Sequence, residues 1–491
     1  MKLISSSFKA LLLLYLIFNI LSCGSKITAN KNDHFKIEKK KQNILFIAID
    51  DLRPMLNSYG NSQIITPNLD KLAAEGVQFN NAYCNVAVCG ASRATIMTGI
   101  RPSATRFVSY YTRADKEVPE AVSLHGIFKK NGYKTISYGK IFHNAKDFKN
   151  DWSEIDDTHT QFDYQSKEAL KLIKNKPDRK RGPAFEYTEV SDETYSDGKT
   201  TNKAIQKLKE LKKTEEPFFL AVGYVSPHLP FIQPTKYGEL YKDKDLVMAD
   251  NPFKPKNAPK QAVHNSSELR NMYMGIPKEG LLPTKLSKDL VRGYYASVSY
   301  TDVLVGKLIK QLDDLGLRDN TTIILWGDHG FFLGEHGMWT KHSTLNEAIH
   351  VPLIVSSPGM KKNVKTTAMT EYIDIYPSLC EIAGIEIPKY LTGTSFVPVL
   401  KDPNLEVKSE IYTRYRKGEA VVDHNYSYTE FVNKKGEPTN AFMLFDIKND
   451  KKQNVDISKQ PRNAKTVEKY REKLKAMRKQ VNKNPIENIV K

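Results

Sequence analysis

Residues Cys89 to Arg93 combine a thiol and a guanidinium within a stretch of small side chains. The segment reads Cys-Gly-Ala-Ser-Arg and continues into a helical pattern that ends at Gly99. This spacing predicts a helix that begins at or just before Cys89, where unpaired N–H groups and the helix dipole favour negative charge. The segment therefore indicates a reactive group beside an anion-binding arginine, although a buried, inert cysteine gives the same pattern.

Three carboxylates stand directly after apolar runs of the kind that form buried strands. Asp50 and Asp51 follow one run, and Asp328, with His329 beside it, follows another. Neighbouring carboxylates in a partly desolvated place repel each other unless a cation or a proton lies between them. Oxygen donors of this kind predict a hard divalent cation, calcium or magnesium, although imidazole is a poor ligand for calcium. Taken singly, Asp50 or Asp51 could cap a helix and Asp328 could form a salt bridge.

Four basic side chains stand near these carboxylates or after other apolar runs. Lys140 and His143 are three residues apart, His228 lies between two prolines that stiffen its loop, and Lys341 follows Asp328 along the chain. Together with Arg93 they would form a cationic pocket for an oxyanion such as sulfate or phosphate. Each of these residues alone is typical of a surface or core position, so the pocket depends on all of them meeting in one place.

The chain alternates apolar runs with helical patterns. This alternation predicts an α/β fold with a large, mostly parallel central sheet flanked by helices. Ligands in such folds bind beyond the carboxyl ends of the strands, which is where the candidate residues stand. We expect strands at 44–49, 133–138, 218–225, 322–326 and 351–355 and helices at 69–75, 119–130 and 288–315.

Two long stretches and a change of composition interrupt the alternation. Residues 148–195 and 231–283 are predicted to be irregular, and loops of that length are functional or disordered. We expect a catalytic domain over 42–404 and a smaller C-terminal α+β subdomain over 405–491. The subdomain would contain an antiparallel sheet, with strands at 411–415 and 421–431, and a basic helix at 464–481.

Residues 1–22 have the pattern of a lipoprotein signal peptide. Two lysines precede an apolar run, 10–21, which is too short for a spanning helix and is followed by Ser22 and Cys23. This ending resembles the lipobox of bacterial lipoproteins, which implies cleavage before Cys23 and lipidation of its sulfur. Residues 23–41 would form a polar tether. The sequence thus predicts an exported, membrane-anchored lipoprotein, with a plain secretory signal and an unmodified Cys23 as the alternative.

Charge and cysteine content add two further constraints. The formal net charge of +18 favours an anionic partner, either an acidic polysaccharide or an acidic lipid. Because no nucleic-acid-binding motif accompanies this charge, we expect no nucleic-acid partner. Four cysteines exclude a disulfide-based scaffold, while a single bridge between Cys84 and Cys380 stays open.

Five motifs, in order along the chain, carry a resemblance to a known family. They read DDLRP from Asp50, AVCGASRATIMTG around Cys89, YGKIFH around Lys140, VSPHLPF around His228, and GDHGFFLGEHGMWTKHS around Asp328. The chain resembles the type I sulfatases of the alkaline-phosphatase superfamily and, among them, the iduronate-2-sulfatases. The resemblance covers nearly everything from residue 43 onward and implies the alkaline-phosphatase-like fold.

The resemblance implies a modified cysteine and a bound metal ion. Cys89 would be oxidised to Cα-formylglycine (3-oxoalanine), and the gem-diol formed by its hydration would attack the sulfur of a sulfate ester. One Ca²⁺ would be bound by the modified Cys89 together with Asp50, Asp51, Asp328 and His329. The partner for maturation would be a formylglycine-generating enzyme or an anaerobic sulfatase-maturating enzyme. Ala91 stands where many family members have proline, which leaves open which of the two acts.

The same resemblance assigns roles to the basic residues. Arg93 and Lys140 would stabilise the formylglycine, and His143 would be the base that regenerates it. His228 and Lys341 would face the substrate, with His228 as the general acid for the leaving oxygen. Cys89 and Arg93 are the main residues that distinguish this sequence from those of related phosphatases.

Taken together, these features predict a sulfatase. The expected substrate is a sulfated, uronate-containing polysaccharide or its oligosaccharides, either a glycosaminoglycan or an algal polymer such as ulvan. The first alternative is a phosphomonoester or phosphonate hydrolase on the same fold. A non-catalytic glycan-binding lipoprotein is the second, but it would lack some of the site residues, and none is missing from this sequence.

Overall fold

Strand β1 (Asn43–Ile49) lies inside the main sheet, and all of its side chains are buried. Side chains alternate across a strand, so the even-numbered residues from Ile44 to Ala48 join one hydrophobic core and the odd-numbered ones from Leu45 to Ile49 join another. The predicted strand, apolar along its whole length, is therefore confirmed as one that is covered on both faces. The computed structural model describes residues 41–160, 162–174, 182–433, 436–483 and 486.

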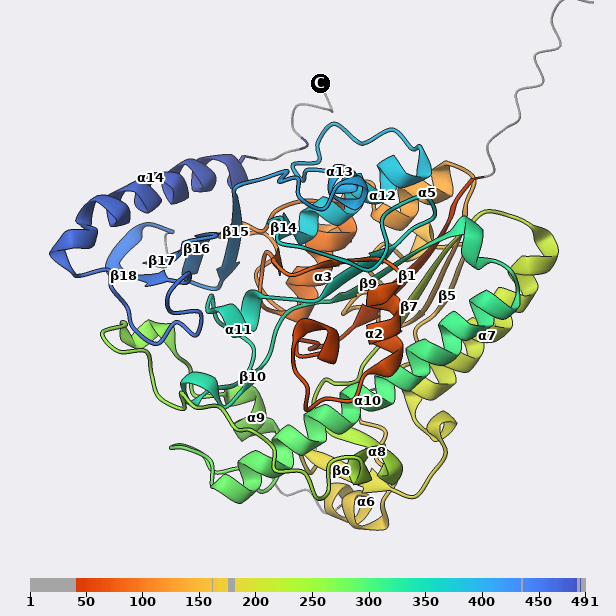
Figure 1. The fold of residues 1–491 in the computed structure, drawn as a ribbon, viewed down its shortest axis with the longest axis horizontal. Coiled ribbons are helices and arrows are strands. Elements are labelled where there is room, and N and C mark those ends of the chain that lie inside the picture. Colours follow the sequence, from red (N-terminus) through yellow and green to blue (C-terminus); the bar gives the residue numbers. More distant parts are fainter. Residues whose placement is uncertain (1–40, 161, 175–181, 434–435, 484–485, 487–491) are drawn as a thin grey trace, which may run out of the picture. The chain divides into compact units, whose positions relative to one another are not determined.

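The main sheet has eight strands in the described part of the chain, in the order β13-β2-β12-β9-β1-β7-β4-β5 (Figure 1). Strand β12 runs antiparallel to both of its neighbours, and the other neighbouring pairs are parallel. The predicted mostly parallel sheet is thus confirmed. Its remaining strands are β2 (Val77–Phe79), β4 (Lys134–Gly139), β5 (Glu154–Asp156), β7 (Phe218–Tyr224), β9 (Thr321–Gly327), β12 (Leu353–Ser356) and β13 (Val364–Thr366).

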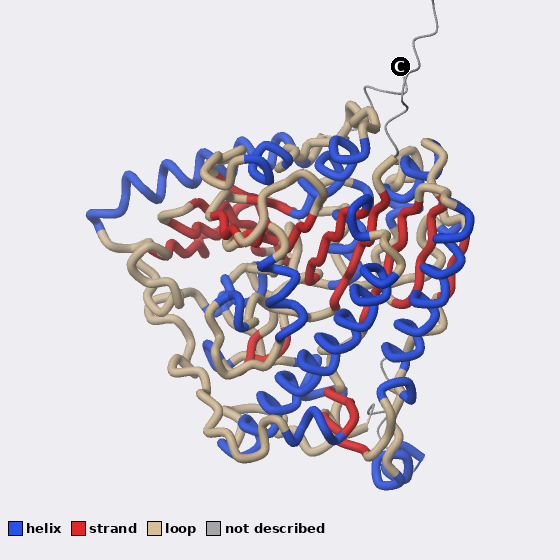
Figure 2. The backbone as a smooth tube through the Cα atoms, turned by 45° about the vertical axis from the view of Figure 1, so that its right-hand side comes forward, coloured by secondary structure: helices blue, strands red, loops and turns tan. Residues whose placement is uncertain are grey.

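Helices cover both faces of this sheet. One face packs against α2 (Pro67–Ala74), α7 (Ser196–Thr214) and α10 (Thr284–Asp314), whose apolar residues share a core with the odd-numbered side of β1. The other face packs against α3 (Cys89–Thr98), α5 (Leu124–Lys130) and α12 (Ile375–Ala383). Figure 2 shows the same layering from a second direction, with blue helices alongside the red strands of the sheet.

The parallel strands β1, β4, β7 and β9 are adjacent, so their carboxyl ends lie at one edge of the sheet. Asp50 follows β1, Lys140 follows β4, His228 lies in the loop after β7, and Asp328 follows β9. The fold therefore brings these loops together, as expected for ligand sites in α/β sheets.

Two predicted elements have different boundaries in the structure. The helix expected at 119–130 is shorter, because the Ser123 hydroxyl caps α5 by accepting a hydrogen bond from the Gly126 N–H at 3.0 Å. The strand expected at 421–431 is two strands, β16 (Gly418–Asp423) and β17 (Tyr426–Val432). The carboxylate of Asp423 accepts hydrogen bonds from the N–H groups of Asn425 and Tyr426 and so fixes the turn between them.

The stretches 148–195 and 231–283 are not irregular throughout, so this prediction is wrong in part. Strands β6 (Phe185–Thr188) and β8 (Phe231–Pro234) pair in parallel, although they lie far apart along the chain. These short elements have too few residues to show a period in the sequence. The elements in the two stretches include β5, α6 (Lys167–Lys174), β6 (Phe185–Thr188), β8 (Phe231–Pro234), α8 (Thr235–Glu239) and α9 (Ser267–Met272).

The predicted C-terminal antiparallel sheet is confirmed. Its order is β15-β16-β17-β18, with β15 at Glu410–Tyr415 and β18 at Pro438–Asp446. Helix α14 (Ala464–Val481) lies along this sheet in Figure 1, and its Tyr470 and Leu474 share a small core with Tyr412 and Leu444 of the strands. A helix with one apolar stripe and an otherwise charged surface packs in this way.

The described residues from Lys41 onward belong to one compact unit, and the boundary expected at 404/405 stays a prediction. The expected signal peptide, Cys23 and all but the last residue of the tether lie outside the described residues. Among the residues that are described, no helix is long and apolar enough to cross a membrane.

Cys84 and Cys380 are both buried free thiols, so the structure excludes the bridge that the sequence left open. Burial raises the pKa of both thiols, that of Cys380 to about 12. We therefore expect iodoacetamide to label both residues slowly in the folded protein and completely after unfolding without reductant. Mass spectrometry of the two peptides measures this labelling, and a disulfide-linked peptide in the unreduced, unfolded sample would contradict the structure.

Candidate active site

The predicted helix start at Cys89 is confirmed, because α3 begins at this residue and its N-cap, Val88, is extended. Ser92, one turn into the helix, donates a hydrogen bond from Oγ to the carbonyl oxygen of Asp328 at 2.6 Å. This bond ties the first turn of α3 to the end of β9. Cys89 is therefore held at the edge of the sheet where the parallel strands end.

Four candidate ligands meet at Cys89. One ligand atom each from Asp50, Cys89, Asp328 and His329 lies within 4.8 Å of the others, and all four residues are buried. The Cys89 sulfur lies 3.1 Å from His329 Nε2, while His329 Nδ1 lies 3.0 Å from the Gly330 carbonyl oxygen. Since a carbonyl oxygen accepts and cannot donate, Nδ1 carries the proton in this contact and the lone pair of Nε2 faces the cluster. We call these four residues the metal-binding cluster.

Arg93 is fully buried and connects two of the carboxylates. Its Nε donates to Asp328 at 2.9 Å and its second terminal nitrogen donates to Asp50 at 3.2 Å. Lys140 forms a further buried ion pair with Asp50. Burial alone would raise the pKa of Asp50, but Lys140 and Arg93 overcome it and hold this pKa well below its usual value. Asp50 is therefore ionised at neutral pH.

Asp51 belongs to a second group of charges, with Lys341, His228 and Glu268. Lys341 Nζ lies 3.0 Å from both carboxylate oxygens of Asp51, 3.0 Å from Glu268 and 3.1 Å from His228 Nε2. Burial would lower the pKa of His228, but the nearby Asp51 carboxylate raises it to about 10. His228 is therefore protonated at neutral pH, and its Nε2 lies beside Lys341 Nζ.

His143 differs from His228 in its charge. Burial and the neighbouring Lys140 lower the pKa of His143 to about 3, so its imidazole is neutral. Its buried Nδ1 has no hydrogen-bond partner among the described residues. His143 thus offers a neutral, available nitrogen beside a cationic group.

The unmodified Cys89 thiol is not activated. Burial, together with the negative charge of Asp50, raises its pKa to about 12, so little thiolate exists at neutral pH. A cysteine that acts as a nucleophile in its own right has the opposite environment. The surroundings of Cys89 therefore favour a group other than a thiol as the reacting species.

The structure brings together all the site residues expected from the sequence, and it adds Glu268 and His159, which were not expected. Glu268 lies on α9 and His159 follows β5, and both come from stretches that were predicted to be irregular. Burial, and after it the positive charges of Lys140 and Arg93, lower the pKa of His159 to about 4. Neither residue follows an apolar run or stands in a recognisable motif, so no sequence signal marked them.

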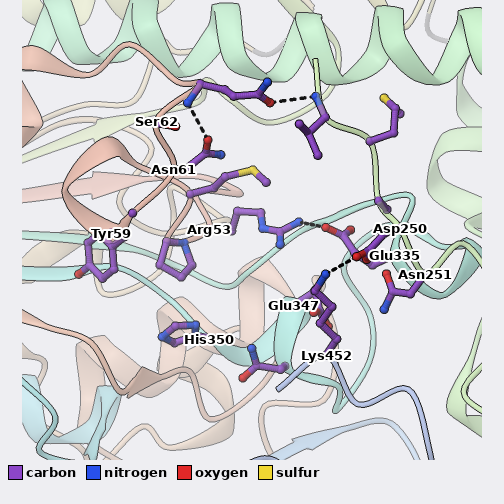
Figure 3. Close-up of a pocket in the computed structure, with 18 of the residues that line it drawn as sticks. Arg53, Tyr59, Asn61, Ser62, Asp250, Asn251, Glu335, Glu347, His350 and Lys452 are labelled. Atoms are coloured by element: carbon purple, nitrogen blue, oxygen red, sulfur yellow. Dashed lines mark hydrogen bonds and ion pairs between the residues drawn. The ribbon is translucent and has the colours of Figure 1, made fainter. Parts of the chain in front are cut away.

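A separate cavity of about 710 Å³ lies beside this site, and none of the predicted catalytic or metal-binding residues lines it. Figure 3 shows that Arg53 and Glu335 meet across it, with a distance of 2.8 Å between Nη1 and Oε1. The Arg53 N–H donates to Tyr294 Oη, which donates to the Asp51 carbonyl oxygen at 2.9 Å. The wall of this cavity therefore supports the backbone that carries Asp51.

The site combines carboxylates that suit a divalent cation with cationic groups that suit an oxyanion. A proton donor, His228, and a neutral imidazole, His143, lie at its edge. At the strand ends of an α/β sheet, this combination defines a hydrolase that cleaves sulfate or phosphate esters.

Comparison with known proteins narrows this class. The Sulfatase family model matches residues 42–385, and the model described as N-sulphoglucosamine sulphohydrolase, C-terminal, matches residues 334–480. Human iduronate 2-sulfatase is 31% identical over 391 residues, which cover 72% of this chain and 71% of that protein. The ulvan-active sulfatase of Formosa agariphila is 29% identical over 411 residues, covering 80% of this chain and 71% of that protein. The chain belongs to the sulfatase family and is a sulfuric ester hydrolase.

Solved structures confirm the fold. A protein in complex with its substrate D-glucosamine-2-N,6-O-disulfate matches with a TM-score of 0.72 and 21% identity, covering 91% of this chain and 100% of that one. The phosphonate monoester hydrolase of Agrobacterium radiobacter matches with a TM-score of 0.72 and 20% identity, covering 90% and 96% of the chains. The predicted alkaline-phosphatase-like fold is therefore correct.

Replacing Glu268 by glutamine tests its place in the site. The amide keeps the shape of the side chain but removes a partly buried counter-charge from Lys341 and His228, so we expect kcat to fall by about 10- to 100-fold. Sulfate release from an aryl sulfate and the thermal unfolding midpoint are the measurements. Glu279→Gln, at an exposed position of the same segment, is the matched control. An unchanged kcat in folded Glu268→Gln would show that Glu268 has no part in the reaction.

Proposed function

We propose that the protein is a formylglycine-type, calcium-dependent sulfatase for sulfated, uronate-containing polysaccharides or their oligosaccharides. The observation that carries the proposal is the environment of Cys89. Its sulfur lies 3.1 Å from His329 Nε2 within the metal-binding cluster, at a helix N-terminus, and Arg93 connects the two carboxylates of that cluster. These are the surroundings that a metal-assisted sulfate-transfer centre requires.

The donor set fits a hard divalent cation. Asp50 and Asp328 offer carboxylate oxygens, and the Nε2 lone pair of His329 faces the same place. Asp51 groups with Cys89 and His228, and its Oδ1 lies 3.5 Å from His329 Nε2, so it adjoins this cluster. A bound Ca²⁺ would act as a Lewis acid toward a sulfate oxygen. Oxidation of Cys89 would supply an aldehyde hydrate as the nucleophile, in place of a thiol that is protonated at neutral pH.

The basic residues would perform the binding and proton-transfer steps. Lys140 and Lys341 would attract the anionic ester. When the bond between sulfur and the sugar oxygen breaks, the electron pair stays on that oxygen, which needs a proton. His228 is protonated and would donate it from Nε2, because its Nδ1 is engaged with the Leu229 carbonyl oxygen at 2.5 Å. His143 is neutral and would accept the proton released when the nucleophile is regenerated.

Two observations support a sulfated polysaccharide as substrate. Human iduronate 2-sulfatase and the ulvan-active sulfatase of Formosa agariphila are both relatives of this chain. The net charge of +18 favours a polyanionic partner over a small neutral one. A glycosaminoglycan and an algal uronate polymer such as ulvan both meet these conditions.

We propose further that the chain is exported and anchored to a membrane through lipid on Cys23. The support is the sequence alone, in which a short apolar run ends in a lipobox-like segment. Export would also place the enzyme where a large polysaccharide can reach it. Oxidation of Cys89 would require a formylglycine-generating or an anaerobic sulfatase-maturating partner.

The Cys89→Ala variant tests the proposal. We expect it to release no sulfate above background from a 2-O-sulfated uronate oligosaccharide, while the parent enzyme does, because the variant lacks the atom that becomes the nucleophile. Cys84→Ala, which removes another buried thiol, should retain activity. Mass spectrometry of the Cys89 peptide from the native host should find the decrease in mass that accompanies conversion of –CH₂SH to –CHO. Sulfate release that persists in Cys89→Ala would overturn the mechanism.

Paired aryl sulfate and aryl phosphate esters separate this function from the alternative. A phosphomonoester or phosphonate hydrolase would turn over the phosphorus ester much faster than the sulfate ester. We expect the reverse order, and a preference for the phosphorus ester would contradict the sulfatase proposal.

Calcium removal tests the proposed metal. Since a ligand that binds the folded state stabilises it, we expect chelation by EGTA to lower both the unfolding midpoint and the activity, and added Ca²⁺ to restore them. Asp328→Asn should weaken this response, because it removes one charged ligand of the cluster. Identical unfolding midpoints with Ca²⁺ and with EGTA in the parent protein would argue against calcium.

A further inference from the structure

Tyr110 and Tyr111 form an exposed pair of aromatic rings. Their ring centroids lie 3.9 Å apart with an interplanar angle of 36°. The side chains are 45% and 76% exposed, among the more exposed large apolar side chains in the described part of the chain. Exposed aromatic surface of this kind marks binding sites more often than it contributes to stability.

The pair lies next to the active site. The ring of Tyr110 meets the ring of His143 edge-on at a centroid distance of 5.9 Å. The backbone of Tyr110 packs against Gly90, the residue after Cys89, so closely that a Cβ at Gly90 would lie 2.4 Å from the Tyr110 carbonyl oxygen. Exposure increases from His143 to Tyr110 to Tyr111, so the three rings lead from the catalytic centre to solvent.

The turn that carries the two tyrosines is held by local hydrogen bonds. The Tyr111 N–H donates to Ser109 Oγ at 3.2 Å, and the Thr112 N–H donates to the Ser109 carbonyl oxygen at 3.2 Å. The Ser109 N–H in turn donates to Thr112 Oγ1 at 3.4 Å. A turn fixed in this way loses little conformational entropy when a ligand binds to it.

The charge of the nearest arginine along the chain is already balanced by a neighbouring carboxylate. Arg113 forms hydrogen bonds with both carboxylate oxygens of Asp115, at 2.9 and 2.6 Å. The tyrosine pair therefore presents aromatic faces rather than a free charge. Such faces carry partial negative charge and attract the weakly positive C–H groups on one side of a pyranose ring.

We propose that Tyr110 and Tyr111 are a stacking subsite for the pyranose ring adjacent to the sugar that carries the scissile sulfate. The inference rests on the proposed function, because it takes a sulfated oligosaccharide as the substrate. The subsite selects for chain length and ring orientation, since a sulfated monosaccharide has no second ring to place there.

Tyr111→Ala and Tyr111→Phe test the subsite as a matched pair. The parent enzyme and both variants are compared on a heparin-derived tetrasaccharide with a terminal 2-O-sulfated iduronate and on 2-O-sulfated iduronate itself. In Tyr111→Ala we expect the kcat/KM ratio of tetrasaccharide to monosaccharide to fall by about tenfold, through KM, because the stacking face is lost. Tyr111→Phe keeps the ring and should keep the ratio. Phe253→Ala, which removes a 51% exposed ring elsewhere, should also keep it.

Binding in the inactive Cys89→Ala background separates the two proposals. Isothermal titration calorimetry with the tetrasaccharide should show Kd about tenfold higher when Tyr111→Ala is added. Unchanged Kd and unchanged kcat/KM ratio would overturn the subsite while the sulfatase function stands. Equal losses on both substrates would also overturn it, because the second ring would then play no part. If the parent enzyme released no sulfate from either saccharide, a glycosaminoglycan substrate would be excluded, and the Kd comparison alone would decide the subsite.

Discussion

Compensation of buried charge is the constraint on which the rest of this structure depends. An isolated buried ion is costly, and removing one member of a buried pair leaves the other without a partner. Each charged side chain of the site must therefore find its partner in the same small volume, and the parallel strands provide that volume by ending at one edge. The charges concerned are those of Asp50, Asp51, Glu268 and Asp328 on one side and Arg93, Lys140, His228 and Lys341 on the other.

This constraint also explains what could be predicted from the sequence. An apolar run such as that of β1 is typical of a strand buried on both faces, and the residues directly after such a strand lie at the edge of the sheet. For Asp50, Lys140, His228 and Asp328, position along the chain therefore implied position in space. The α/β class and most of the candidate site followed from this reasoning and from the family motifs.

The remaining residues could not be found in this way, because their positions depend on tertiary contacts. Glu268 reaches Lys341 from α9, a helix of six residues, which is too short to show a period. Tyr110 lies in a loop and reaches the site because its backbone packs on Gly90. Helix α5 begins later than its pattern suggests because Ser123 caps it. The position of this helix start therefore depends on one hydroxyl group. Local hydrogen bonds and packing decided each of these positions.

The same charges link the architecture of the protein to its chemistry. Arg93 and Lys140 balance the carboxylates of the metal-binding cluster through direct ion pairs with Asp50 and Asp328. A site with only the carboxylates would repel a sulfate ester, and a site with only the cations would not hold a divalent metal ion. A metal ion and a sulfate ester can bind side by side only where both sets of charges are already present and paired. The buried ion pairs that join the ends of β1, β4 and β9 therefore also prepare the surface on which a sulfate ester would react.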